Sequence, residues 1–286
     1  MTKRLYFIIG DPIAQARSPD VFNARFAQSG LDAEMAPLEV APAGFADVMA
    51  ALSQIGNCGG VVVTIPHKPA AAALASIRSK RVEIAGAANV MRRAGQGWEA
   101  DLFDGEGFLG GLKRRGWAPA GRRAAVVGAG GAGLAVSAAL LEAGAAQVWL
   151  DDVDGRRADR AVARLAAHYG DRVSRGRPGA GHDLVVNATP VGMAPGDSPP
   201  IDLDALNASV LVADVIMKPA RTRLLLEAER RGMETQPGAP MLDEQADMIW
   251  RFFDLPGEPG PARPESNGTA AEPSIGRNSA ATRAAP

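Results

Sequence analysis

Residues 124–145 read AAVVGAGGAGLAVSAALLEAGA, a short β-type run followed by a glycine-rich turn and a helical pattern. A G-x-G-x-x-G turn between a strand and a helix is typical of dinucleotide-binding units. Gly128 permits the tight turn, Gly130 lets the backbone approach a pyrophosphate, and Gly133 allows the helix to pack closely. The helix N-terminus offers unpaired N–H groups to the phosphates. The alternative is a turn that binds nothing, but the context predicts a dinucleotide site at Gly128, Gly130, Gly131 and Gly133.

The next β-type run ends at residues 149–152, Trp-Leu-Asp-Asp, and its acidic end bears on the choice of dinucleotide. A carboxylate about 20 residues beyond the glycines can accept hydrogen bonds from both adenosine ribose hydroxyls and repel a 2′-phosphate. Asp152 in that role predicts NAD. A solvated loop carboxylate is the alternative, and Arg156 and Arg157 would then receive the phosphate of NADP.

Outward from this stretch, short β-rich runs alternate with longer helical patterns, which is typical of α/β architecture with largely parallel sheets. The expected strands are 5–9, 33–38, 61–64, 124–127, 148–150, 184–187 and 210–215. Helical periodicity covers 19–29, 132–143, 156–168, 223–231 and 241–253. The strands form two sets, which predicts two α/β domains joined near residues 105–121.

Composition excludes several classes of partner. The chain has 286 residues and a net charge of −1, so it has no basic footprint for nucleic acid and no charge excess for an anionic membrane surface. Cys58 is the only cysteine, and His67, His168 and His182 lack the spacing of metal ligands. With neither a signal peptide nor a membrane span expected, we predict a soluble cytoplasmic protein with a small-molecule substrate. The Pro- and Gly-rich segment 256–286 is expected to be a disordered tail.

Six short motifs, in order along residues 10–246, resemble those of the shikimate and quinate dehydrogenase family. The family's G-x-P-I-x-H-S-x-S-P appears as GDPIAQARSP at residues 10–19, with Ser18 in place and Ala16 where the first carboxylate-binding serine stands. Its G-x-N-V-T-x-P-x-K appears as GVVVTIPHK at residues 60–68. That segment keeps Thr64 and the catalytic Lys68, and Val62 replaces the asparagine.

The other motifs are similar to the family pattern in the same way. GAANV at residues 86–90 keeps Asn89, and LFDG at residues 102–105 keeps Asp104, while their threonine and asparagine companions are replaced. Residues 187–193, NATPVGM, are similar to the loop beside the nicotinamide, and residues 238–246 to G-x-x-M-L-x-x-Q-A. The resemblance thus implies that Gln245 reaches the substrate and that the cofactor is contacted by Asn187, Thr189, Met193, Val215 and Gly238.

The resemblance also implies that the two domains bind different molecules. Residues 1–104 are expected to bind substrate, with 238–255 returning to them as a C-terminal helix, and residues 105–237 to form a Rossmann-type domain for NAD, or alternatively NADP. The implied reaction is reversible hydride transfer between a cyclic hydroxy acid, such as shikimate or quinate, and its 3-keto form, in aromatic amino acid biosynthesis. A dehydrogenase of another ring, such as an amino-substituted shikimate, and a silent NAD-binding sensor are the alternatives. The oligomeric state stays open, with a homodimer as one option.

Alcohol oxidation needs a group that takes the hydroxyl proton as hydride leaves. The resemblance gives that role to Lys68, with Asp104 orienting the hydroxyl and the ammonium; a solvated lysine and a helix cap are the alternatives. A helix N-terminus and desolvation both favour a neutral Lys68, whereas the charge of Asp104 opposes it, so the sequence leaves the protonation of the pair open. Substrate contacts are expected from Ser18, Thr64 and Asn89, with Arg17 replacing the missing serine, and the neighbouring His67 is expected to be indirect or exposed. Apolar side chains are expected to line the pocket at Val62, Val90, Leu102 and Phe103.

Overall fold

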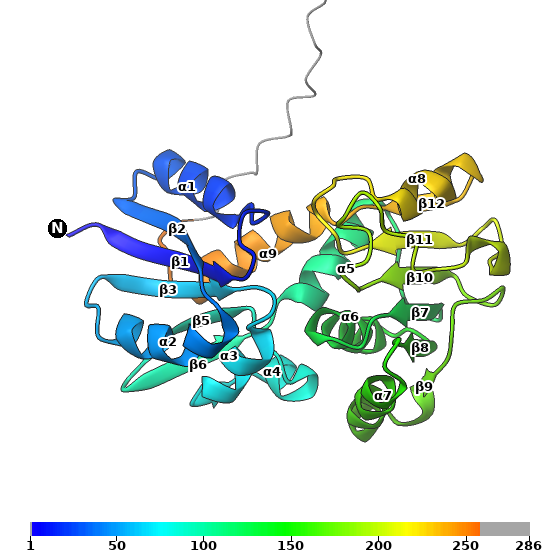
Figure 1. Cartoon of the computed structure of the whole chain (residues 1–286), viewed down its shortest axis with the longest axis horizontal. Helices are drawn as coiled ribbons and strands as arrows, with labels where there is room; N and C mark the ends of the chain where they lie inside the picture. The colour runs from blue at the N-terminus through cyan, green and yellow to red at the C-terminus, as the bar shows by residue number, and fades with distance from the viewer. Residues whose placement is uncertain (1, 258–286) are drawn as a thin grey trace, which may run out of the picture.

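A computed structural model describes residues 2–257 of the chain, and residues 258–286 of the expected tail lie outside the described part. Two sheets stand side by side, each covered by helices, and α5 (Asp104–Arg114) and the start of α9 (Ala239–Phe252) lie between them (Figure 1). The predicted α/β class is confirmed.

The first sheet is mixed, in the order β2-β1-β3-β5-β6-β4. Its strands are β1 (Arg4–Gly10), β2 (Ala33–Glu39), β3 (Cys58–Val63), β4 (Ile77–Arg78), β5 (Val90–Ala94) and β6 (Gly97–Asp101). The helices of this half are α1 (Ser18–Gln28), α2 (Phe45–Ser53), α3 (Lys68–Leu74) and α4 (Lys80–Ala85), with a 3-10 turn at Pro42–Gly44. β1, β2 and β3 are parallel, so their carboxyl ends deliver the loops at residues 11–17 and 64–67 to one edge.

The second sheet has the order β12-β11-β10-β7-β8-β9, and every neighbouring pair is parallel. Its strands are β7 (Arg123–Val127), β8 (Gln147–Asp151), β9 (Val173–Arg175), β10 (Leu184–Asn187), β11 (Leu211–Asp214) and β12 (Glu234–Gln236). The helices are α6 (Gly131–Glu142), α7 (Gly155–Tyr169) and α8 (Arg223–Arg230), with 3-10 turns at Gly170–Arg172 and Leu203–Ala205. This is the Rossmann order, in which ligands bind where the strand order reverses, here between β7 and β10.

The C-terminal helix α9 (Ala239–Phe252) returns to the first half, as the sequence predicts. Its Trp250 is fully buried, with its ring 5.7 Å from that of Phe26 on α1. The buried Arg25 of α1 donates to Asp247 of α9 at 2.6 Å. Apolar burial and a hydrogen-bonded ion pair therefore fix α9 against α1.

The stretch between the sheets is a helix, α5 (Asp104–Arg114), wedged between α6 and α9. A Cβ on Gly105 would lie 2.7 Å from the Cβ of Ala139 on α6, and one on Gly107 would lie 2.6 Å from Cγ of Gln245 on α9. The missing side chains let both helices approach α5 closely. That packing brings the start of α5 next to Gln245.

Candidate active site

A cavity of about 400 Å³ lies between the two sheets and receives residues from both. Its volume falls in the usual range for small-molecule sites. From the first half it is lined by Ile8, Gln15, Ala16, Arg17, Ser18, Val62, Val63, Thr64, Ile65, Pro66, Lys68, Asn89 and Asp104. From the second half and α9 it is lined by Ala132, Ala188, Thr189, Pro190, Met193, Val215, Ile216, Met217, Lys218, Met241, Leu242 and Gln245.

Lys68 and Asp104 meet in this cavity. Lys68 Nζ donates to Asp104 Oδ2 at 2.5 Å, and the side chains are 15% and 3% exposed. The other carboxylate oxygen, Oδ1, accepts from Asn89 Nδ2 at 3.1 Å and from Gln245 Nε2 at 3.0 Å. Four residues far apart in sequence thus form one hydrogen-bonded group. The two amides occupy one carboxylate oxygen, which leaves the other for the ammonium.

Local structure holds each member of this group. Lys68 begins α3, directly after a loop from the carboxyl end of β3, and Asp104 is the first residue of α5. Asn89 Oδ1 accepts from the N–H of Phe103, which orients the amide so that its nitrogen faces Asp104. His67 is buried rather than exposed: its Nε2 lies 2.7 Å from the carbonyl oxygen of Val40. His67 therefore anchors the start of α3 from behind the cavity.

The residues expected to bind substrate partly gather here. Ser18, at the start of α1, is buried and lines the cavity together with Arg17 and Thr64. Val62 lines it as well. The expectation was wrong for the other three apolar side chains, Val90, Phe103 and Leu102, which do not line this cavity. Val90 and Phe103 are buried in the same core cluster as Trp250, and Leu102 is buried in the larger core.

The glycine-rich turn adopts the geometry that a dinucleotide needs. Gly128 has φ +110°, which disfavours other residues, and a Cβ there would lie 2.8 Å from the backbone of Ala188. A Cβ on Gly130 would meet nothing within 4 Å, so this is the open side of the turn. Gly133 packs directly on the backbone of Gly128. The residues present therefore fit a pyrophosphate lying along Gly130 at the N-terminus of α6.

Asp152 follows β8, but its carboxylate is engaged within the protein. Oδ2 accepts from the N–H of Ala129 at 2.8 Å and Oδ1 from the N–H of Asp154 at 2.9 Å. Asp154 Oδ1 in turn accepts from the N–H of Arg156 at 3.0 Å and caps α7. Between the two carboxylates the side chain of Val153 is fully exposed. Asp152 thus holds the glycine-rich turn in shape, a role that its position at the strand end does not reveal.

The loop after β10 is organised by Asn187. Its Oδ1 accepts from Oγ1 of Thr189 at 2.7 Å, and its Nδ2 donates to the carbonyl of Val191 at 3.0 Å and to the Asp214 carboxylate at 3.3 Å. Thr189, Met193 and Val215 line the cavity, whereas Asn187 is buried behind them. Gly238 is the residue just before α9, and a Cβ there would lie 2.7 Å from the carbonyl oxygen of Val215. It therefore sets the approach of α9 to this loop.

Asp214, at the end of β11, was not singled out from the sequence. It accepts from the N–H of Ile216 at 2.9 Å and from Oγ1 of Thr222 at 2.8 Å, in addition to Asn187. It therefore ties together the loops after β10 and β11. Burial raises the pKa of Asp214 to about 6, although these hydrogen bonds oppose the rise. The rule that sites form at the carboxyl ends of parallel strands was the available signal. Met217 and Lys218 of the same loop were also missed and line the cavity.

The raised pKa predicts a pH dependence of stability. The pKa of about 6 in the folded state exceeds that of an unfolded aspartate, about 4, so folding favours the protonated carboxyl. The contribution of Asp214 is complete below about pH 4 and is lost as the pH rises through about 6. We expect a loss of about 2–3 kcal/mol across this window relative to Asp214→Asn, which has no such group. Urea unfolding of both proteins from pH 4 to 7 measures it, and parallel curves would contradict it.

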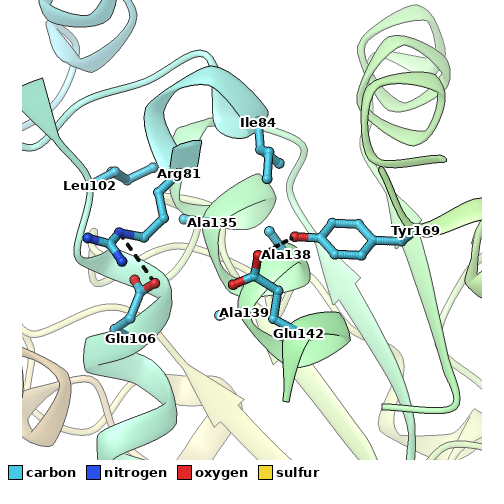
Figure 2. A pocket seen from close by; sticks show the side chains of 9 residues that line it. All are labelled: Arg81, Ile84, Leu102, Glu106, Ala135, Ala138, Ala139, Glu142 and Tyr169. Carbon is cyan, nitrogen blue, oxygen red and sulfur yellow. Dashed lines mark hydrogen bonds and ion pairs between the residues drawn. The ribbon is translucent and has the colours of Figure 1, made fainter. Parts of the chain in front are cut away.

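A second contact between the two halves lies beside a cavity of only about 10 Å³. Figure 2 shows Arg81 of α4 facing Glu106 of α5, and these two side chains are 3.4 Å apart. Within the second half, the hydroxyl of Tyr169 on α7 donates to Glu142 of α6 at 3.0 Å. Burial raises the pKa of Glu106, and the Arg81 guanidinium opposes that shift. This space has room for a water molecule at most. It is a packing contact between the halves, and the larger cavity is the candidate site.

Two further expectations concern absences. Within residues 2–257, no three His, Cys, Asp or Glu side chains are grouped closely enough to hold a metal ion. Across the same residues, no helix is long and apolar enough to span a bilayer.

Comparison with known proteins places this site in a family. Residues 8–91 match the model of the shikimate dehydrogenase substrate binding domain. The shikimate dehydrogenase (NADP(+)) of Cereibacter sphaeroides is 40% identical over 245 residues, which cover 84% of this chain and 87% of that protein. The structure of shikimate 5-dehydrogenase from Listeria monocytogenes in complex with shikimate and NAD matches with a TM-score of 0.80 at 26% identity, covering 90% of this chain and 93% of that one. Quinate dehydrogenase from Corynebacterium glutamicum in complex with NAD matches with a TM-score of 0.78 at 28% identity, covering 88% and 92%. The chain therefore belongs to the shikimate dehydrogenase family.

Proposed function

We propose that this protein is an NAD(P)-dependent dehydrogenase of a cyclic hydroxy acid of the shikimate or quinate type. The observation that carries the proposal is the Lys68–Asp104 pair, with Nζ and Oδ2 2.5 Å apart in a cavity that both sheets line. A sensor that only binds dinucleotide has no use for a buried proton-transfer pair. The 40% identity with a shikimate dehydrogenase supports the same reaction class.

Each half has its own part in this proposal. The first sheet and α9 hold the substrate, between Ser18 and Thr64 on one side and Gln245 on the other. The second sheet would hold the dinucleotide, with the open side of the turn at Gly130 available to the pyrophosphate and the cavity residues Thr189, Met193 and Val215 available to the nicotinamide. When bound, the nicotinamide supplies the hydride acceptor.

The residues of the cavity manage the proton. Lys68 in its neutral form accepts the proton of the substrate hydroxyl as the carbon–hydrogen bond breaks, and it returns that proton in the reverse direction. Asp104 stabilises the resulting ammonium and orients both the amine and the hydroxyl. Asn89 and Gln245 fix the carboxylate, so that the pair is in place before substrate arrives.

The experiment is a steady-state assay of dinucleotide reduction. Purified protein is supplied with NAD or NADP and, in separate reactions, with shikimate, quinate and an amino-substituted shikimate. Turnover of any of these supports the dehydrogenase, and the ranking identifies the ring. Binding of dinucleotide without turnover of any ring would favour the sensor.

We expect NAD to bind more tightly than NADP, by about tenfold, which corresponds to about 1.4 kcal/mol. In the Rossmann fold the loop after the second strand of the dinucleotide-binding sheet contacts the adenosine ribose. Here that strand is β8, and the loop carries Asp152 and Asp154. Their charges repel a 2′-phosphate, and Asp154 already occupies the N-terminal amide of Arg156 on α7. The relative from Cereibacter sphaeroides is named for NADP(+), so this preference would distinguish the two proteins.

Titration of both reduced cofactors by fluorescence tests this preference. The exposed Val153 allows a matched pair of variants that leaves the core unchanged. Val153→Arg should strengthen NADPH binding by adding a cation at the loop, whereas Val153→Ala should not. Wild-type preference for NADP would instead assign the phosphate to Arg156 and Arg157.

A further inference from the structure

The four glycines of the dinucleotide turn face different surroundings. The missing side chain of Gly128 makes room for the backbone of Ala188 and that of Gly133 for the backbone of Gly128, both within the second half, and that of Gly130 leaves open space. Gly131 differs from the other three. A Cβ on Gly131 would lie 2.7 Å from the Cβ of Ala87, which belongs to the other half of the protein. A separation under 3.0 Å is essentially never seen for real Cβ atoms, so something would have to move.

The surface that Gly131 approaches also carries Lys68. The same Cβ would lie 3.9 Å from both Cβ and Cδ of Lys68. Ala87 is buried, and its neighbour Ala88 donates its N–H to the carbonyl oxygen of Lys68 at 2.9 Å. Ala87 and the start of α3 are therefore linked through the backbone. The side chain of Ala87 is a single methyl group, so it cannot rotate out of the way.

We propose that Gly131 is a positioning residue whose missing side chain sets the distance between the dinucleotide turn and Lys68. The inference rests on the proposed function, because it concerns the alignment of substrate, held beside Lys68, with a nicotinamide, held by the second sheet. Gly131 begins α6, and its approach to Ala87 lies beside Lys68, which lines the active-site cavity. No cofactor contact is needed to explain the glycine.

The contact has a measurable consequence for catalysis. Ordinary van der Waals separation begins at 3.4 Å, so a methyl group at Gly131 requires the two Cβ atoms to move apart by about 0.7 Å or more. A misplacement of this size costs up to about 100-fold in rate. Alanine is a better helix former than glycine, so Gly131→Ala should fold. We expect kcat to fall by about 10- to 100-fold at saturating NAD.

The test compares Gly131→Ala, Ala87→Gly and the double variant. Ala87→Gly removes the methyl group that the new side chain meets, so the double variant should recover the kcat of Ala87→Gly alone. Gly130→Ala is the matched control in the same turn: its Cβ enters open space on the cofactor side, so it should raise the Kd for NADH. A deuterated carbinol position should show a larger isotope effect on kcat in Gly131→Ala than in wild type.

Thermal unfolding of wild type, Gly131→Ala, Ala87→Gly and the double variant tests the contact without relying on activity. Gly131→Ala should lower Tm when residue 87 is alanine and not when it is glycine. A wild type without turnover on any ring would refute the proposed function, while the unfolding cycle would still decide whether residues 131 and 87 are coupled. The positioning proposal is overturned by wild-type kcat in Gly131→Ala, by a double variant no faster than Gly131→Ala, or by Tm changes that simply add.

Discussion

Replacement of Lys68 by alanine is expected to lower kcat by about 10²–10⁴-fold, the usual contribution of a general acid or base. Nζ of Lys68 is 2.5 Å from Asp104 in the cavity, whereas the dinucleotide turn belongs to the other sheet. The Kd for NADH should therefore change little. Steady-state kinetics and a fluorescence titration of NADH separate the two quantities.

Two further variants test whether proton transfer is the reason. Lys68→Arg keeps the positive charge next to Asp104, but an arginine does not deprotonate in proteins. It should be nearly as slow as Lys68→Ala if Lys68 accepts the hydroxyl proton, and much faster if only the charge matters. Lys80→Ala removes an exposed lysine outside the cavity and should leave kcat unchanged. Near-wild-type turnover in Lys68→Ala would remove Lys68 from the mechanism.

Asp104 supplies the complementary measurement. Its carboxylate has three hydrogen-bonding partners, so Asp104→Asn replaces one acceptor oxygen by a donor facing either Lys68 or the amides of Asn89 and Gln245. A buried donor facing a donor is costly. We therefore expect kcat to fall as in Lys68→Ala, which steady-state kinetics on the two variants would show; wild-type kcat in Asp104→Asn would contradict it.

The sequence predicted those strands and helices whose own residues form a clear apolar pattern. The strand at Leu184–Asn187 is a continuous apolar run, and the glycine-rich turn sits between an apolar strand and an apolar helix, so both were found. The β5–β6 hairpin was missed because its strands carry charges: Arg92 donates to Glu99 across the pair at 2.8 Å. Charged side chains on one face of this hairpin, which lies inside the sheet between β3 and β4, interrupt the apolar pattern that identifies a buried strand.

In the candidate site, too, the sequence predicted some features and not others. Family motifs brought Lys68, Asp104, Asn89 and Gln245 into one hypothesis, and the structure brings the four into one hydrogen-bonded group. No sequence pattern fixes the direction of a side chain after a strand, so Asp152, which bonds to Ala129, was assigned from position alone. Val90 and Phe103 were expected in the cavity because they adjoin Asn89 and Asp104 along the chain. A neighbour of a site residue faces the core as readily as the cavity, and both side chains are in the core.

Shikimate is expected to be a poor substrate, because Ala16 stands where the family pattern has a carboxylate-binding serine. Ala16 and Ser18 both line the cavity, so a hydroxyl at residue 16 would reach its interior. A hydrogen bond to a charged group contributes about 1.5–3 kcal/mol, which corresponds to about 10- to 100-fold in kcat/KM. Ala16→Ser should therefore raise kcat/KM for shikimate by about that factor.

Neighbouring residues decide which ring is preferred and what holds its carboxylate instead. Val62 presents an apolar surface to the cavity where the family pattern has an amide, so a less hydroxylated ring should rank above shikimate. Arg17 also lines the cavity, and its guanidinium is able to hold a carboxylate through two hydrogen bonds. Arg17→Ala should then raise KM for every carboxylate substrate. The gain in kcat/KM from Ala16→Ser should be larger in the Arg17→Ala variant than in wild type. Efficient turnover of shikimate by wild type, with no gain from Ala16→Ser and no loss from Arg17→Ala, would show that the carboxylate is held elsewhere in the cavity.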